Sequence, residues 1–224
     1  MTKRPKPVQL TLVHGDAEVL RAPTPLSRAV GRQRERRAAP APKPWLAVLL
    51  SVDTARRSGW GVSVSGRRVD SGELETLDEA AIDKVVLWAV DLAALQQLPL
   101  VLVLESPWGG NVHVVAALGQ ARERWRRAWC AAGQASARIV KVTPNEWRGP
   151  VLGSRYVKAP REEIRAQEQL IARAMVGRVV GPDEAPAILI GHWGSHAAEV
   201  GKAIGKRAQR ASLKSWTTRT TPEK

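Results

Sequence analysis

Apolar residues in this chain form two short unbroken runs that each lead into a carboxylate. The run WLAVLLSV at residues 45–52 is followed by Asp53, and the run LPLVLVL at residues 98–104 is followed by Glu105. Unbroken runs of this length are typical of strands that are buried on both faces of a sheet. A core strand fixes its backbone, so its last residue points an acid to a defined place. If the two acids meet in space, they could hold a divalent metal.

Further segments have the pattern of strands and complete a sheet. GWGVSVS and RRVDSGEL flank Gly66 as the two arms of a hairpin, and ARIVKVT forms a later strand. The predicted strands cover residues 45–53, 59–65, 67–74, 99–105 and 137–143.

Between and after these strands, apolar residues recur at helical spacing. Asp78 is placed to cap the first helix, and Pro182 to open the last one. Residues 144–153 form a loop or a short helix. The predicted helices cover residues 79–97, 112–132, 161–175 and 183–198.

The order of these elements predicts an α/β fold. Three strands in a meander come first, followed by helix, strand, helix, strand and further helices. This order indicates a mixed five-stranded sheet, with an antiparallel meander plus parallel strands, flanked by helices.

Charge divides the chain into three parts. Residues 1–44 carry 10 Lys and Arg against 3 Asp and Glu, residues 201–224 carry 7 against 1, and residues 45–200 carry 18 against 17. We expect a disordered, basic, Pro- and Arg-rich arm over 1–44, a folded domain over 45–200 and a basic C-terminal tail over 201–224. The net charge of +14 suits nucleic acid, because each neutralised phosphate releases counterions. Purely solvated arms are the alternative.

The remaining composition limits the class of protein. Cys130 is the only cysteine, which excludes a disulfide framework and a cysteine-based zinc site and fits a reducing cytoplasm. No apolar run reaches the ~18 residues of a membrane span, and the N-terminus MTKRPKPVQL lacks an apolar signal core. Heavy use of Ala, Arg and Trp without any Phe indicates a GC-rich bacterial or phage genome. We therefore expect a cytoplasmic, DNA-associated protein.

Each candidate acid has a structural alternative when it is taken alone. Asp53 could be a turn former, and Asp183 could stabilise the N-terminus of a helix through the helix dipole. Glu105 is harder to explain without a function, because a charge directly after LVLVL is costly unless it is paired or used.

In their order and setting, the three acids resemble the pattern of the RuvC family of Holliday junction resolvases, within the RNase H-like superfamily. VLLSVDTARRSGWGVSV is similar to the family's first strand, acid, turn and second strand, and LVLVLESPWG to the strand with the second acid. LGQAR at 118–122 is typical of the bacterial resolvases, and DEAPAILIG at 183–191 is similar to the family's last helix. The resemblance covers about residues 45–198 and implies an RNase H-like fold, in a phage-type or divergent bacterial member.

The resemblance implies a metal-dependent, structure-selective endodeoxyribonuclease. Such an enzyme hydrolyses phosphodiester bonds in branched DNA, resolving Holliday junctions as a homodimer. Asp53, Glu105 and Asp183 would be catalytic and would bind two Mg²⁺ ions per site, for which Mn²⁺ could substitute. Two ions clamp the attacking and leaving oxygens of the displacement. The products would carry a 5′-phosphate and a 3′-hydroxyl.

The sequence departs from this family at Pro186, where the family has a fourth acid. Glu184 is the candidate that could replace it as a metal ligand. His192 follows Asp183 by nine residues, half a turn away on a helix, so we interpret His192 as structural. Two alternatives to the nuclease therefore stay open. One is a catalytically degenerate RNase H-like nucleic-acid-binding protein, and the other is a nuclease that acts on another nucleic-acid substrate.

Basic and aromatic residues near these acids are candidate contacts to DNA. Trp108, in the loop SPWGGN, could stack on a base, as the resemblance implies for an aromatic in this loop. Trp125 and Trp129 share one face of the next helix and are predicted to lie in the core. For the basic candidates, plain surface charge is the alternative. The candidate nucleic-acid-binding residues are Trp108, Arg148, Lys158, Arg161, Arg56, Arg57, Arg122 and Arg126.

Overall fold

A computed structural model of the chain describes residues 43–106 and 112–205, without the Val157 side chain. Nearly all of the predicted arm and most of the predicted tail lie outside these residues. The elements are β1 (Val48–Asp53), β2 (Arg57–Val64), β3 (Arg67–Glu75), α2 (Glu79–Gln96), β4 (Leu100–Glu105), α3 (Val112–Ala131), η1 (Ser136–Arg138), β5 (Ile139–Val142), α4 (Pro144–Leu152), η2 (Ser154–Lys158), α5 (Arg161–Val176), α6 (Glu184–Gly194) and α7 (Ala198–Ile204).

The five strands pair in the order β3-β2-β1-β4-β5. β1, β2 and β3 form an antiparallel meander, whereas β4 runs parallel to both β1 and β5. The predicted mixed sheet is therefore confirmed. Val52 pairs with Leu104 in the parallel register of β1 and β4. The next residue of each strand, Asp53 and Glu105, consequently ends its strand at the same edge of the sheet.

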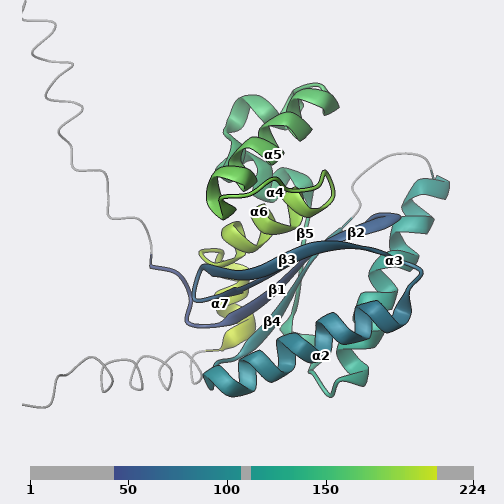
Figure 1. The fold of residues 1–224 in the computed structure, drawn as a ribbon, viewed down its shortest axis with the longest axis vertical. Coiled ribbons are helices and arrows are strands. Elements are labelled where there is room, and N and C mark those ends of the chain that lie inside the picture. The colour runs from purple at the N-terminus through teal and green to yellow at the C-terminus, as the bar shows by residue number, and fades with distance from the viewer. Residues whose placement is uncertain (1–42, 107–111, 206–224) are drawn as a thin grey trace, which may run out of the picture. The chain divides into compact units, whose positions relative to one another are not determined.

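Helices cover both faces of this sheet, with α2 and α3 on one face and α4, α5, α6 and α7 on the other (Figure 1). Side chains alternate between the faces along each strand, so β1 sends Val48 and Leu50 to one core and Leu49 to the other. Burial on both faces explains the unbroken apolar runs of β1 and β4. Within the described ranges, no helix has the length and apolar character needed to cross a bilayer.

Two tryptophans of α3 fill the core beneath α2, as predicted. Trp125 and Trp129 are fully buried. Each indole N–H still finds an acceptor: Trp125 donates to Ser58 Oγ at 3.3 Å, and Trp129 donates to the carbonyl of Ala135 at 3.1 Å. The arginines between them remain at the surface, so α3 is attached to the sheet through its aromatic stripe.

The helix predicted over 183–198 is two helices in the structure. α6 ends at Gly194 and α7 begins at Ala198, so regular structure also continues past residue 200. Trp45, just before β1, explains the break. Its backbone N–H donates to the carbonyl of Ser195 at 2.8 Å and its indole to that of Ala197 at 2.7 Å. The carbonyls of Ser195 and Ala197 therefore bond to Trp45, which holds both residues in the turn between the two helices.

The segment 144–153 forms a helix, α4, because its start is capped. The backbone N–H of Thr143 donates to the Glu146 carboxylate at 2.6 Å, and Thr143 Oγ1 donates to the same oxygen at 2.8 Å. These contacts belong to a capping box, and Pro144 occupies the first turn, where no N–H is needed. α4 is therefore fixed directly after β5.

α6 lies close to the sheet because β2 presents glycines to it. A Cβ on Gly59 would lie 1.6 Å from the carbonyl oxygen of Asp183, and a Cβ on Gly61 would lie 3.2 Å from Ser51 Oγ. Ser51 Oγ bonds to the carbonyls of both Gly61 and Ala187, at 3.0 and 2.8 Å. Gly59 and Gly61 therefore allow the start of α6 to pack closely against β2, next to Asp53.

Gly59→Ala is expected to destabilise the fold, because the new methyl group would overlap the backbone of Asp183, which cannot rotate away. We expect a loss of about 3 kcal/mol or more in the free energy of unfolding, measured by urea denaturation. Gly119→Ala on α3 is the matched control, since nothing lies within 4 Å of its Cβ position. That variant should gain about 0.5–1 kcal/mol. Equal effects of the two substitutions would contradict the close packing of α6.

Candidate active site

Asp53 and Glu105 lie in contact at the ends of β1 and β4. Their carboxyl groups are within hydrogen-bonding reach of each other. The strands are also joined at this point by Thr54, whose hydroxyl donates to the carbonyl of Glu105 at 3.0 Å. The two acids that the sequence analysis singled out are thus brought together by the parallel pairing of their strands.

This contact changes the protonation of the pair. Burial, and then the neighbouring Glu105 carboxylate, raise the pKa of Asp53 well above its usual range. Two carboxylates at one place cannot easily both ionise, and this favours the protonated form of Asp53. A site of this kind can accept a cation, which would replace the proton and relieve the repulsion.

Trp147 on α4 holds Glu105 in place. Its indole Nε1 donates to Glu105 Oε1 at 2.8 Å, and both side chains are buried. A buried acceptor that loses its donor costs about 1–3 kcal/mol, so this bond fixes the orientation of the carboxylate. Trp147 was not identified from the sequence.

A third acid, Glu168 on α5, lies near this pair and was also not identified from the sequence. Its charge contributes to the raised pKa of Asp53, and the charge of Glu105 in turn acts on Glu168. Only 2% of Glu168 is exposed, and burial raises its pKa although Arg148 opposes this. Arg148 Nε donates to Glu168 Oε1 at 2.9 Å. The site therefore contains three acids and one paired arginine.

One feature of the sequence could have pointed to Glu168. Along α5 the buried or partly buried positions include Ile164, Glu168 and Ala172, which are four residues apart and share one face of the helix. A glutamate within an apolar stripe must be paired or used. The spatial partners Arg148 and Asp53 are distant in sequence, so the stripe alone could not reveal what Glu168 contacts.

Asp183 lies at the start of α6, one strand away from the acid pair. Its backbone lies against Gly59, the residue that pairs with Asp53 across β1 and β2. Burial and then Glu73 raise the pKa of Asp183, while three nearby arginines oppose them. The carboxylate of Asp183 is thus surrounded by a different set of charges from that around Asp53. The structure also brings Glu168 into the electrostatic surroundings of the pair.

Glu184 has a structural environment. Its carboxylate accepts hydrogen bonds from Ser71 Oγ at 2.6 Å, from Arg178 and from the backbone N–H of Gly181 at 3.3 Å. Burial acts to raise the pKa of Glu184, but these donors lower it overall. Because both oxygens already have donors, the structure gives no support to Glu184 as a metal ligand.

The acids at the strand ends fit a hard divalent cation by their chemistry. Among the residues that the structure describes, no three His, Cys, Asp or Glu side chains form a ready-made metal-binding group. Asp53 and Glu105 are nevertheless in contact, and both supply the oxygen ligands that Mg²⁺ prefers. Glu168 is close by but is engaged with Arg148. Two candidate ligands are therefore in contact, and Glu168 would have to leave Arg148 to join them.

Four of the basic candidates lie beside the acids. Arg148 pairs with Glu168, and both Arg57, on β2, and Arg161, at the start of α5, are near enough to act on the pKa of Asp183. Arg122 Nη1 donates at 3.2 Å to the hydroxyl of Ser106, which directly follows β4. These positions are compatible with contacts to a phosphate near the acids.

Other candidates have less distinctive surroundings. Arg56 and Lys158 are exposed, and Arg126 pairs with Glu123 at 2.6 Å. Surface ion pairs of this kind are typical of solvated side chains. Trp108 lies at 107–111, outside the described residues.

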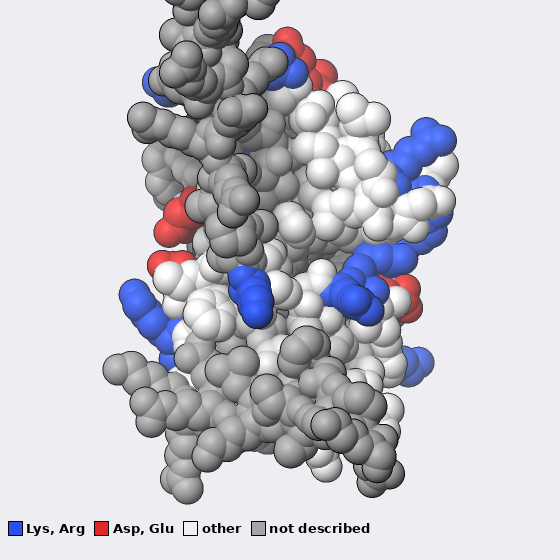
Figure 2. All heavy atoms as spheres, turned by 90° about the vertical axis from the view of Figure 1, so that its left-hand side faces the viewer, with Lys and Arg blue, Asp and Glu red and all other residues white. Residues whose placement is uncertain are grey.

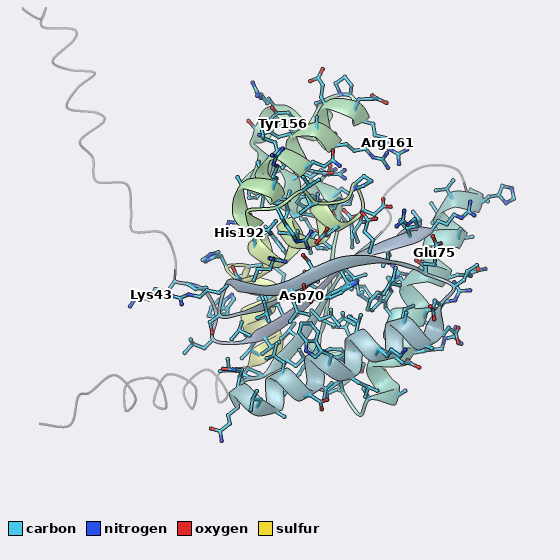
Figure 3. The ribbon with its side chains drawn as sticks, viewed as in Figure 1. Lys43, Asp70, Glu75, Tyr156, Arg161 and His192 are labelled. Atoms are coloured by element: carbon cyan, nitrogen blue, oxygen red, sulfur yellow. The ribbon has the colours of Figure 1, made fainter. Side chains whose placement is uncertain are left out.

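The two ends of the sheet differ. Figure 3 shows Arg161 on the same side of the molecule as Glu75, where β3 ends, and His192 on the opposite side, where Lys43 also lies. Burial and then His196 lower the pKa of His192, and its ring lies edge-on to that of His196. These observations agree with a structural role for His192.

Charged side chains of both signs are visible on the face that Figure 2 shows. The Lys and Arg side chains seen there lie in separate groups, with Asp and Glu groups and uncharged surface between them. This distribution agrees with the nearly balanced charge of residues 45–200.

Solved structures of RuvC share this fold. The structure of Thermus thermophilus RuvC matches with a TM-score of 0.50 and 18% sequence identity, over 69% of this chain and 96% of that chain. T. thermophilus RuvC in complex with a Holliday junction substrate gives the same values. The yeast mitochondrial Holliday junction resolvase Ydc2 matches at 12% identity over 79% of this chain and 91% of that chain, with a TM-score of 0.36.

These matches establish the fold. The chain has an RNase H-like α/β fold, and its predicted resemblance to RuvC is confirmed at this level. No protein-family model and no curated protein sequence matches the chain. The Ydc2 match is too loose to add to the inference.

Asp53→Asn is expected to raise the free energy of unfolding at neutral pH. The folded-state pKa of Asp53 lies above its unfolded value. The stability that this group contributes is therefore fully present below the unfolded pKa and is lost as pH rises through the folded pKa. Asparagine does not ionise, so the variant avoids this loss. Its advantage over the wild type should grow from acidic to neutral pH, to on the order of 1 kcal/mol or more.

Urea denaturation at a series of pH values measures this difference. Asp91→Asn, which changes an exposed aspartate of α2, is the control and should show no such growth. If Asp53→Asn were less stable than the wild type at neutral pH, the carboxylates would not repel each other in the folded protein.

Proposed function

We propose that this protein is a metal-dependent endonuclease that cuts branched DNA, with four-way junctions as its substrate. The observation that carries the proposal is the contact between Asp53 and Glu105, with its raised pKa, at the carboxyl edge of an RNase H-like sheet. Structural ion-pair networks seldom place two acids against each other, whereas sites built for a cation do. The junction in the matched RuvC complex supports the choice of substrate.

Asp53 and Glu105 would hold the cation, with Glu168 as the third carboxylate of the site. Mg²⁺, for which Mn²⁺ could substitute, would supply positive charge against the developing charge on the phosphate and a more acidic water, and a pair of ions could bind. Trp147 orients Glu105, and Thr54 joins the two strand ends. Arg122 and Arg161 would contact the DNA backbone. A homodimer would present two such sites to the two strands of a symmetric junction.

A binding protein without cleavage is the second candidate. Pro186 is buried in α6 where a further acid was expected, and Glu168 is engaged with Arg148. A protein of this class would bind junctions tightly, in a salt-sensitive way, and without any dependence on Mg²⁺ or Asp53. Incubation with a four-way junction and Mg²⁺ tests both candidates, since the second candidate predicts that the junction is bound but not cut.

Wild-type protein incubated with a mobile four-way junction and Mg²⁺ should nick it. Asp53→Asn should lower the rate by more than the ~10–100-fold that follows the loss of a residue that only supports a ligand. Asp91→Asn, an exposed position on α2, should cut at the wild-type rate. Nicked products are separated on a denaturing gel. Equal cutting by Asp53→Asn and wild type would exclude the nuclease proposed here.

Glu168→Gln should reduce nicking more than Asp183→Asn. The charge of Glu168 helps to raise the pKa of Asp53, whereas Asp183 is surrounded by Glu73 and arginines. The measurement is the nicking rate of each variant as a function of Mn²⁺ concentration, where a lost ligand shifts the cation requirement upward. A severe loss in Asp183→Asn together with a mild one in Glu168→Gln would return Asp183 to the place of the third ligand.

A further inference from the structure

Arg148 is the arginine bound to the acids of the candidate active site. It lies on α4 and donates through Nε to Glu168 at 2.9 Å. The side chain of Glu168 is 2% exposed and that of Arg148 is 25% exposed. A buried carboxylate needs a counter-charge, and the partly exposed arginine supplies it while its guanidinium keeps a path to solvent.

The influence of Arg148 extends beyond Glu168. Its charge also acts on Asp53, where it opposes the effect of the neighbouring acids. Its guanidinium lies 5.2 Å from the centre of the Trp147 ring, and Trp147 itself donates to Glu105. Two consecutive residues of α4 therefore each hold one acid of the site. Glu105 is held by a neutral donor, whereas Glu168 is held by a full positive charge.

We propose that Arg148 is the internal counter-ion of this acid cluster, that it competes with a divalent cation for Glu168, and that a nucleic-acid phosphate favours the cation by drawing Arg148 away. This inference rests on the proposed function, because it assumes that the acids bind a cation. Nothing in it requires that cleavage follows. It assigns to Arg148 control over cation binding at Glu168. This role is separate from simple attraction of DNA.

The competition follows from charge. A guanidinium and a divalent cation both bind carboxylate oxygens, and each repels the other when both are near Glu168. Arginine also binds phosphate through paired donors, so an incoming phosphate offers Arg148 an alternative partner. Any factor by which DNA tightens cation binding must equal the factor by which the cation tightens DNA binding. Cation and DNA would thus bind cooperatively through one side chain.

The first test measures Mn²⁺ binding without DNA, by isothermal titration at a fixed, mildly alkaline pH. Arg148→Gln should bind Mn²⁺ at least about tenfold more tightly than the wild type, because the competing charge is gone. Arg148→Lys should lie between them. Arg127→Gln is the matched control, since it removes an arginine of α3 that pairs with Glu79 at 3.5 Å, and it should bind Mn²⁺ as the wild type does. Equal or weaker binding by Arg148→Gln would overturn the inference.

The second test adds a four-way junction with non-hydrolysable linkages at its centre. The junction should tighten Mn²⁺ binding by the wild type, and this gain should shrink in Arg148→Gln. An arginine that only attracts DNA would leave the DNA-free Mn²⁺ affinity unchanged. An equal gain in both proteins would show that phosphate does not act through Arg148.

A double-mutant cycle keeps these outcomes separate from the proposed function. Urea denaturation of Arg148→Gln, Glu168→Gln and the double variant, in the presence of a chelator, should show non-additive losses that report the ion pair itself. Additive losses would overturn the inference whatever the activity. If the wild type binds no Mn²⁺ with or without DNA, the proposed function fails and this inference with it. If the wild type binds Mn²⁺ and Arg148→Gln binds no tighter, only the inference fails.

Discussion

Repulsion between the carboxylates of Asp53 and Glu105 shapes the surroundings of the candidate site. The two acids are in contact because β1 and β4 run parallel and in register, so neither can withdraw without disturbing a core strand. The protein must then stabilise negative charge at a buried edge. A proton on Asp53 would do so, and a bound cation could do so in its place. The raised pKa of Asp53 results from its burial and from this repulsion.

α4 carries two of the hydrogen-bond donors that stabilise this negative charge. Its capped start after β5 places Trp147 and Arg148 over the strand ends, where one donates to Glu105 and the other to Glu168. A helix that begins directly after the last strand is a rigid support, so the two donors are held at fixed places relative to the acids. Trp147 and Arg148 thus stabilise two of the three carboxylates. Trp147 does so through a neutral hydrogen bond to Glu105, and Arg148 through an ion pair with Glu168.

A separate network fixes α6 and accounts for the position of Asp183. Glu73 Oε1 on β3 accepts hydrogen bonds from the backbone N–H groups of Asp183 and Glu184, at 2.9 and 3.0 Å, and so caps the helix from the sheet. Glu184 is bound by Arg178 and Ser71. Glu73 and Glu184 thus serve the attachment of the helix, and Asp183 takes part through its backbone N–H.

The sequence by itself determined the strands, most helix bounds, the mixed sheet and the pair Asp53 and Glu105, because apolar periodicity and chain order are local properties. Trp125 and Trp129 were placed in the core for the same reason. The tertiary structure alone decided that Glu168 joins the pair, that Glu184 is bound by Arg178 and that the last predicted helix divides. Each of these depends on side chains distant in sequence. Burial and charge pairing depend on which residues are neighbours in space. A hydrophobic pattern along the chain does not identify those neighbours.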